Sequence, residues 1–294
     1  MALGLTVLAS GSSGNAALVE ADGCSLLIDA GLGPRQMATR LATVGVSWPR
    51  IQAVLLTHTH GDHWNDRVFA HLLRLRTAVW CHAEHLAALR RHCSCFAAMH
   101  RAQLFRTDEG DKEFAITGLV RCRPLSVRHD SGATFGFRFD GAASLFNAGW
   151  ALGYVADLGC WNESLADSLT DVDLLALEFN HDVVLQRSSG RSQSLIDRVL
   201  GDDGHLSNEQ AAALVLAVGR RSSPRKLHRL VQLHLSRQCN RPELARLAAR
   251  RAVDTLGADT AIHTAEQDSA SERLPLVDVG WDQRACERRP TVIT

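Results

Sequence analysis

One short segment, residues 57–63, constrains this chain more than any other. It has the sequence Thr-His-Thr-His-Gly-Asp-His and directly follows an apolar run, residues 51–56, which we expect to form a strand. In an extended segment, side chains two positions apart point to the same side. His58 and His60 can therefore bind one metal ion from the end of this strand.

The second half of the segment supplies two more candidate ligands. Gly61 allows the chain to turn sharply, and Asp62 and His63 are then presented to a second metal ion. Imidazole nitrogen and carboxylate oxygen form the ligand set of zinc and related ions. The alternative is a histidine-rich surface loop. We disfavour it because a polar cluster this dense would lack partners if it were buried.

The composition is that of a globular protein. The chain has 294 residues, 46% of them hydrophobic, which is enough for one large domain or two small ones. The 32 basic and 32 acidic residues give a formal net charge of zero, which excludes a global field that attracts nucleic acid but not a local patch. Eight cysteines occur without a CxxC pair, as expected in a reducing compartment.

The N-terminal residues show no targeting signal. No basic region followed by an apolar core is present there, and no apolar run approaches the ~20 residues that a membrane span needs. We therefore expect a cytoplasmic protein without a membrane segment.

The pattern of apolar residues predicts strands first, then strands mixed with helices, and the same order a second time. The expected strands are 5–9, 16–20, 25–29, 51–56, 77–81, 115–120, 122–127, 134–139, 152–156, 172–178, 230–233 and 260–264, and the expected helices are 34–44, 67–76, 83–99, 162–169, 193–200, 208–219 and 243–256. This order suits an α/β fold with two sheets packed face to face and helices outside. Residues 1–268 would form one domain, and residues 269–294, which lack periodicity, a C-terminal tail.

Further metal ligands must lie at strand ends, as His58 does, to share one rim of such a fold. Four polar positions meet this condition, namely His129, Asp157, His181 and His234. Five other histidines lie among leucine, alanine and arginine, and we expect them at the surface or its boundary; they are His71, His82, His85, His92 and His100.

The pattern His-x-His-x-Asp-His after an apolar strand resembles the signature of the metallo-β-lactamase superfamily. The resemblance implies the four-layer αβ/βα sandwich of that superfamily and a site for two divalent metal ions. One His, one Asp and one His should follow the first motif, and His129, Asp157 and His234 match them, although His181 and His205 compete for the last position. The implied ligands are His58, His60 and His129 for one ion and Asp62, His63 and His234 for the other, with Asp157 bridging both.

A bridging carboxylate implies a specific chemistry. It holds two metal ions about 3.5–4 Å apart, a spacing that stabilises both sides of a phosphoryl displacement. A hydroxide that bridges the two metals would be the nucleophile, and Asp62 would orient it in addition to ligating a metal. Zinc, manganese and iron all accept this ligand set, so the sequence does not distinguish among them.

Two later segments resemble the ribonuclease Z-like phosphodiesterase branch of the superfamily. They are Gly-His-Leu-Ser-Asn at residues 204–208, which precedes a helix, and Leu-His-Leu-Ser at residues 233–236. In that branch the first histidine acts at the scissile phosphate and the second binds metal. The resemblance therefore implies that His205 stabilises the phosphate or donates a proton, as a leaving alkoxide of high pKa requires.

Residues 8–15, 129–130 and 178–182 add a resemblance to the YycJ (WalJ) subgroup, which is regarded as a group of DNA exonucleases. The chain departs from that subgroup in two places. Residues 187–194 are serine-rich where a Tyr-Pro turn is typical, and residues 147–150 look like an added loop. Both departures concern access of the substrate more than the metal ligands.

Several residues are candidates for substrate contacts. The loop of Ser10 to Asn15 is either a plain turn or a phosphate-binding backbone, and in the second case Ser12, Ser13 and Asn15 would take part. His181 belongs either to the rim of the site or to the core. Residues 220–251 carry ten basic residues, Arg237 among them, against one acid, Glu243, which suits either a polyanion or an ordinary solvated helix face.

Taken together, these residues predict a dinuclear metal-dependent hydrolase, a phosphodiesterase or nuclease, with DNA favoured over RNA and an end favoured as the place of cleavage; DNA against RNA or a small phosphodiester stays open. A thioester or lactam hydrolase of the same fold is the alternative, in which the His205 turn and the basic segment would have no role. A binding protein with an inert site is disfavoured by the intact ligand set. The sequence leaves exonuclease against endonuclease action open, and also monomer against dimer.

Overall fold

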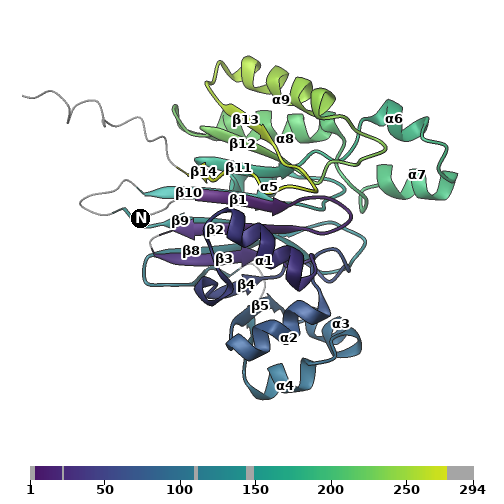
Figure 1. Cartoon of the computed structure of the whole chain (residues 1–294). Helices are drawn as coiled ribbons and strands as arrows, with labels where there is room; N and C mark the ends of the chain where they lie inside the picture. Colours follow the sequence, from purple (N-terminus) through teal and green to yellow (C-terminus); the bar gives the residue numbers. More distant parts are fainter. Residues whose placement is uncertain (1–3, 22, 109–111, 144–148, 277–294) are drawn as a thin grey trace, which may run out of the picture.

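Two seven-stranded sheets pack face to face in the computed structural model, which describes residues 4–21, 23–108, 112–143 and 149–276 (Figure 1). The first sheet has the order β14 (Leu274–Pro275), β1 (Gly4–Ala9), β2 (Ala16–Ala21), β3 (Cys24–Ile28), β4 (Ala53–Leu55), β5 (Ala78–His82) and β6 (Phe105–Asp108). The second has the order β13 (Ala261–Thr264), β12 (Arg229–Leu233), β11 (Leu174–Glu178), β10 (Trp150–Val155), β9 (Thr134–Gly141), β8 (Val120–Val127) and β7 (Phe114–Ala115).

Helices cover the outer face of each sheet. On the first sheet they are α1 (Pro34–Thr43), α2 (Asp66–Leu75), α3 (His85–His92) and α4 (Phe96–Arg101), with a short 3-10 helix at Trp48–Arg50. On the second they are α5 (Glu163–Ser168), α8 (Asn208–Arg221) and α9 (Pro242–Leu256). Two more helices, α6 (Val183–Arg187) and α7 (Gln193–Leu200), project from one end of the sandwich (Figure 1). The four-layer αβ/βα sandwich expected from the sequence is confirmed.

The four layers follow from the strands, because successive side chains of a strand point to opposite faces of its sheet. In β10, Leu152 and Tyr154 belong to the core between the sheets, whereas Ala151 and Val155 pack under the outer helices. Both faces of this strand are buried, which is why its sequence is nearly continuously apolar. Strands β10, β11 and β12 pair in parallel, so their carboxyl ends meet at one edge of the sheet.

Some elements differ from the sequence prediction. The single helix expected at residues 83–99 is two helices, because Cys93 has an extended backbone and Asp66 binds the Ser94 amide and hydroxyl. The strand expected at residues 115–120 shrinks to β7, and residues 116–119 form a turn instead. The prediction also missed β6, α6 and β14, which are too short to show a period.

Two further differences concern the start of α3 and the expected domain end. His85, expected at the surface or its boundary, is buried, with Nε2 2.9 Å from the Ala133 carbonyl oxygen. Strand β14 lies beyond Asp268 and pairs with β1, with Leu274 opposite Leu5, so the first sheet extends past the expected boundary. Residues 277–294 of the expected tail, and residues 147–148 of the expected added loop, lie outside the described residues.

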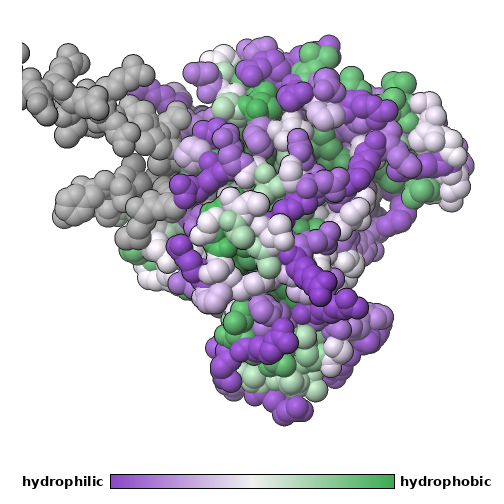
Figure 2. Space-filling model, in the orientation of Figure 1, coloured by the Kyte–Doolittle hydropathy of each residue, from purple (hydrophilic) through white to green (hydrophobic). Residues whose placement is uncertain are grey.

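The surface is mixed in character. On the face shown in Figure 2, hydrophilic residues are interspersed with small apolar groups. Among the described residues, the large hydrophobic side chains that stand exposed are Leu119, Val184 and Leu247. None of the helices that the structure describes has the length and apolar character that a membrane crossing would require.

Candidate metal centre

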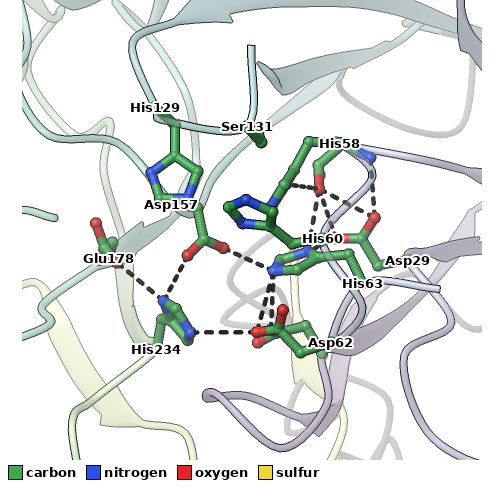
Figure 3. A network of polar contacts seen from close by, with 12 residues as sticks. Asp29, His58, His60, Asp62, His63, His129, Ser131, Asp157, Glu178 and His234 are labelled. Carbon is green, nitrogen blue, oxygen red and sulfur yellow. Dashed lines mark hydrogen bonds and ion pairs between the residues drawn. The ribbon is translucent and has the colours of Figure 1, made fainter. Parts of the chain in front are cut away.

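The candidate ligands gather where strands of both sheets end at one rim of the sandwich. His58 follows β4 of the first sheet, while His129 follows β8, Asp157 follows β10 and His234 follows β12 of the second. Figure 3 shows these side chains converging, with Asp157 between His63 and His234. The expectation that strand-end residues share one rim agrees with this geometry.

Three of the converging residues have an uncommon backbone. Asp29, Asp157 and His234 all have φ near +60°, with values of 60°, 55° and 55°. Non-glycine residues adopt this left-handed conformation rarely and at a cost of about 1–3 kcal/mol each, which the surroundings must offset. Each lies just after a buried strand, so the unfavourable turns lie together at the rim and aim the side chains inward.

His58, His60 and His129 form the first group of donors, and one ring nitrogen of each lies within 4.8 Å of the others. His129 Nδ1 donates to the Gly204 carbonyl at 2.9 Å, which leaves its Nε2 as an acceptor that faces the group. His58 Nδ1 lies 3.0 Å from Thr57 Oγ1, so its Nε2 is likewise directed inward. This arrangement suits one divalent cation.

Asp62, His63, Asp157 and His234 form a second group around Asp157. His63 Nε2 lies 2.9 Å from Asp157 Oδ2. Asp62 Oδ2 lies 3.7 Å from His63 Nε2 and 3.9 Å from His234 Nε2. His234 Nδ1 is 2.7 Å from Asp157 Oδ1, so Asp157 contacts a histidine with each of its oxygens.

Buried polar atoms without partners test whether these residues fit a metal. His58 Nε2 and His234 Nε2 are buried and make no hydrogen bond to any described residue, and buried Asp157 Oδ2 has its ion pair with His63 but no further partner among them. Such orphaned atoms cost free energy unless a cation or water satisfies them. They are nitrogen and oxygen atoms that face one another, which is the donor set of a divalent transition metal.

Electrostatics at His63 agrees with this interpretation. Burial alone would lower the pKa of His63, but Asp157 and Asp29 raise it to about 10. His63 Nδ1 already contacts Asp29 Oδ2 at 2.7 Å, so the positive charge that the carboxylates favour would lie at Nε2, next to Asp157. The residues present therefore fit a divalent metal ion at this position.

Asp29 is a functional candidate that the sequence analysis missed. It is fully buried and accepts hydrogen bonds from the Thr57 amide at 2.9 Å and from His63 Nδ1 at 2.7 Å. Burial raises the pKa of Asp29, and these partners lower it only in part. A carboxylate that orients a ligating histidine in this way fixes its tautomer and strengthens metal binding. Its place at the end of the strand expected at residues 25–29, directly after β3 in the structure, was the available signal.

Gly31, and not Gly61, is the glycine that the motif turn requires. A side chain at Gly31 would place Cβ 1.7 Å from the Asp62 carbonyl oxygen. Around it, the Asn15 and Ala30 amides donate to the carbonyls of Asp62 and His63. Gly61 has open space around it, and φ there is not positive. The sharp turn expected at Gly61 is present, with the His63 amide 3.0 Å from the His60 carbonyl oxygen, but it does not require a glycine at that position.

Glu178 is the second candidate that was missed as a site residue. Its Oε1 lies 2.8 Å from His205 Nδ1 and 2.9 Å from His234 Nδ1, and its Oε2 accepts from the Leu158 and Leu206 amides. Burial would raise the pKa of Glu178, but the two histidines lower it to about 2, so this carboxylate is ionised. It ends a buried strand, as the candidate ligands do, and that position could have identified it.

His205 lies beside the metal donors. Its Nδ1 is 3.5 Å from Asp157 Oδ1 as well as 2.8 Å from Glu178. Burial would lower the pKa of His205, but Glu178 raises it above the ordinary value, which favours the protonated ring. His205, His234, Asp157 and Glu178 also have donor atoms within 4.8 Å of one another, so the structure places His205 within reach of the metal donors.

The expected substrate-binding residues differ in their positions. Asn15 Nδ2 reaches Asp62 Oδ2 at 3.2 Å and His63 Nε2 at 3.0 Å, while Ser12 and Ser13 are exposed on the adjacent turn. His181 is fully buried, neither of its ring nitrogens has a hydrogen bond to a residue that the structure describes, and burial lowers its pKa to about 4. Arg237 pairs with Asp268 at 2.6 Å.

The basic segment 220–251 does not form one patch at the site. Arg221 pairs with Glu163 and Asp167, and Lys226 pairs with Asp173 at 2.7 Å. Residues 220–228 precede β12 and Arg229 begins it, whereas His234 follows it, so these cations lie at the opposite end of the strand, about 16 Å away at ~3.3 Å per residue. The cations at residues 220–229 therefore do not contribute directly to the site.

Comparisons with known proteins place this geometry in a family. The family model described as a β-lactamase superfamily domain matches residues 25–229. Exodeoxyribonuclease WalJ of Streptococcus pneumoniae serotype 2 is 29% identical over 93% of this chain and 97% of its own length. Exodeoxyribonuclease YycJ of Bacillus anthracis is 27% identical over 87% of this chain and 91% of its own.

A solved structure agrees on the fold. Zn²⁺-bound PqqB from Methylobacterium extorquens superimposes with a TM-score of 0.62 at 16% identity, over 92% of this chain and all of the other. The family model covers more than half of the sequence and includes the motif at residues 57–63 as well as Asp157 and Glu178. The chain belongs to the β-lactamase superfamily.

Proposed function

We propose that this protein is a metal-dependent phosphodiesterase that removes nucleotides from the ends of DNA, using two divalent ions, zinc or manganese, with iron as a further option. The observation that carries the proposal is the Glu178–His205 pair beside the candidate metal donors, with Nδ1 of His205 2.8 Å from Glu178. The names of the two exodeoxyribonuclease relatives support DNA as the substrate.

Each ion would have its own set of ligands. His58, His60 and His129 would hold one and Asp62, His63 and His234 the other, with Asp157 shared between them. When bound, the ions would supply positive charge to the phosphate and an activated water at neutral pH. Asp29 would keep Nε2 of His63 directed at the site through its contact with Nδ1.

His205 would donate the proton that the reaction needs. Phosphodiester cleavage produces an alkoxide of high pKa, and a positioned acid accelerates its departure by about 10²–10⁴. Glu178 favours the protonated ring and holds it through Nδ1, which leaves Nε2 as the donor to the leaving oxygen. Asn15, at hydrogen-bond distance from Asp62, would keep that carboxylate oriented.

The His205→Ala variant tests this assignment. Metal content should equal that of the wild type, while release of nucleotides from linear DNA should fall by about 10² or more, because the acid is lost and the ligands are kept. His100→Ala, a change on the exposed end of α4, is the matched control. Loss of metal from His205→Ala would show that His205 is a ligand. If the wild type hydrolyses a glutathione thioester but does not cleave DNA, the proposed phosphodiesterase function is wrong.

A further inference from the structure

Arg198 stands at the mouth of the metal centre and has no role in the function proposed so far. It lies in the last turn of α7 and its side chain is 57% exposed. Its Nε forms an ion pair with Oδ2 of Asp130, the residue that follows His129. In the described part of the chain, Nε is the one guanidinium nitrogen of Arg198 with a polar contact.

Asp130 connects this arginine to the candidate metal ligands. Its Oδ1 lies 3.4 Å from His129 Nε2 and 3.6 Å from His60 Nε2, the nitrogens that face the first donor group. One oxygen of the carboxylate thus faces the candidate metal position and the other faces Arg198. A phosphate is negatively charged, as the Asp130 carboxylate is, and its oxygens have a similar spacing. It can therefore bridge Arg198 and the candidate metal position in the same way.

Three successive contacts fix α7 against the loop that carries His129. Arg128 pairs with Asp203 at 3.0 Å and with Asp202 at 3.5 Å. His129 Nδ1 donates to the Gly204 carbonyl at 2.9 Å. The Asp130–Arg198 pair is the third contact. Two of these contacts involve the segment directly after α7, so they keep the end of this helix, and with it the backbone of Arg198, beside the mouth.

The surroundings explain why a cation is needed at this place. Asp62 and Asp157 lie at the centre, and Asp130 adds another carboxylate at the mouth. These negative charges repel a polyanion that approaches, and a cation at the mouth reduces that repulsion. The basic residues 220–229 lie at the far end of β12 and do not help.

We infer that Arg198 forms a phosphate-binding subsite at the mouth of the metal centre, which holds a phosphate of the nucleic-acid strand, and that Asp130 occupies the guanidinium until the strand arrives. This inference rests on the proposed function, because it assumes that the substrate is a phosphodiester. The Arg198 guanidinium is paired with Asp130 before the strand binds and with a phosphate afterwards, so it has an anionic partner in both states. Asp130, once released, stays beside the two imidazole nitrogens.

Strand binding by the Arg198→Gln variant tests the subsite. Affinity for a fluorescent single-stranded oligonucleotide with cleavage-resistant phosphorothioate linkages, measured by anisotropy on metal-loaded full-length protein, should weaken about 10-fold. The slope of log affinity against log salt should become shallower by about 0.7, the value for one lost phosphate contact on a single strand. Arg198→Lys should keep the salt slope but bind more weakly than the wild type, since lysine lacks the planar fork.

Two variants separate phosphate binding from a merely structural ion pair. Arg91→Gln, an exposed arginine on α3, should leave affinity and salt slope unchanged. Asp130→Asn frees the guanidinium, so affinity should equal or exceed that of the wild type. If Asp130→Asn weakens binding as much as Arg198→Gln does, the pair is structural and the subsite is wrong.

The choice of oligonucleotide identifies the phosphate. An Arg198→Gln effect confined to strands with a 5′- or 3′-phosphate supports a terminal phosphate as the ligand, and an effect on all strands supports an internal one. If the metal-loaded wild type releases nucleotides from DNA and Arg198→Gln binds with unchanged affinity and slope, the subsite alone is overturned. If the wild type neither binds nor cleaves DNA, both the proposed function and the subsite are overturned.

Discussion

At the scale of single residues, the centre depends on carboxylates that touch no metal position directly. Glu178 and Asp29 each accept from the Nδ1 of site histidines, and each is fully buried. A buried carboxylate with several donors stays ionised or shares its charge with its partners, and it fixes which nitrogen of each ring faces the site. These two residues therefore control the direction and the protonation of His63, His205 and His234.

Glu178→Gln should shift the pH dependence of catalysis. Glu178 raises the pKa of His205, so removal of its charge lowers that pKa, and the protonated acid is then lost at a lower pH. The alkaline limb of the kcat profile should move to lower pH, and kcat at neutral pH should fall by about 10–100-fold. Profiles of the wild type and the variant, each with its metal content measured, check this. An alkaline limb that stays in place would contradict the role of Glu178.

Asp29→Asn should weaken metal binding. The amide no longer supplies the charge that favours a cation between His63 and Asp157, and affinity for metal should fall by about 10–100-fold. Competition titration with a chromophoric chelator measures the change. Asp254→Asn is the matched control, since Asp254 is an exposed carboxylate on α9 and belongs to none of the candidate donor groups among the described residues. Equal metal affinity in both variants would refute the role of Asp29 in orienting His63 for metal binding.

At the scale of elements, strand ends position the site and one close backbone approach fixes the motif turn. Strands β10, β11 and β12 run in parallel and end at the same edge, which brings Asp157, Glu178 and His234 together. The turn that carries Asp62 lies against the turn after β3, where Gly31 allows two backbones to meet. The arrangement of the motif therefore depends on the turn after β3, which comes before α1 in the chain.

Gly31→Ala should destabilise the protein and disturb the metal site together. A Cβ at 1.7 Å from the Asp62 carbonyl cannot be accommodated without moving one of the turns, at a cost of roughly 1–3 kcal/mol or more. Gly61→Ala, in open space inside the motif itself, should fold and bind metal as the wild type does. Chemical denaturation and metal analysis compare the two. A Gly61→Ala variant that is the more damaged of the pair would contradict this account.

Sequence reasoning reached the layers and the convergence of strand-end side chains at one rim because both follow from simple rules. Apolar runs predict buried strands, and polar residues directly after them predict a shared rim, as with His58 and Asp157. Glu178 and Asp29 follow the same rule, but nothing local distinguishes an orienting carboxylate from any other strand-end acid. The Asp130–Arg198 pair joins residues 68 positions apart, and no local pattern reports such a contact.

At the scale of the whole molecule, the metal centre joins the two sheets. The motif belongs to the first sheet, and His129, Asp157 and His234 belong to the second, so ions at this rim would connect both halves of the sandwich. The Nε2 atoms of His58 and His234, which are buried without a hydrogen bond among the described residues, are a cost to the metal-free protein. Metal binding should therefore contribute to global stability as well as to catalysis.

Removal of the metal should lower the melting temperature. A ligand that binds only the folded state stabilises it by about 2.7 kcal/mol at 100 times its Kd. Differential scanning calorimetry of the metal-loaded and chelated wild type should show this difference. His129→Ala should lose most of the response to metal and His100→Ala should keep it. A melting temperature that does not depend on metal would contradict a site that bridges the sheets.

The most direct test of the central claim is digestion of DNA with defined ends by the metal-loaded protein. Linear duplex and single-stranded substrates should release nucleotides from an end, while covalently closed circular DNA of the same sequence should remain intact. Chelation should abolish the release, and zinc or manganese should restore it. Fully metal-loaded protein that releases no nucleotides from linear DNA, or that cuts the circle equally well, would contradict an end-directed phosphodiesterase.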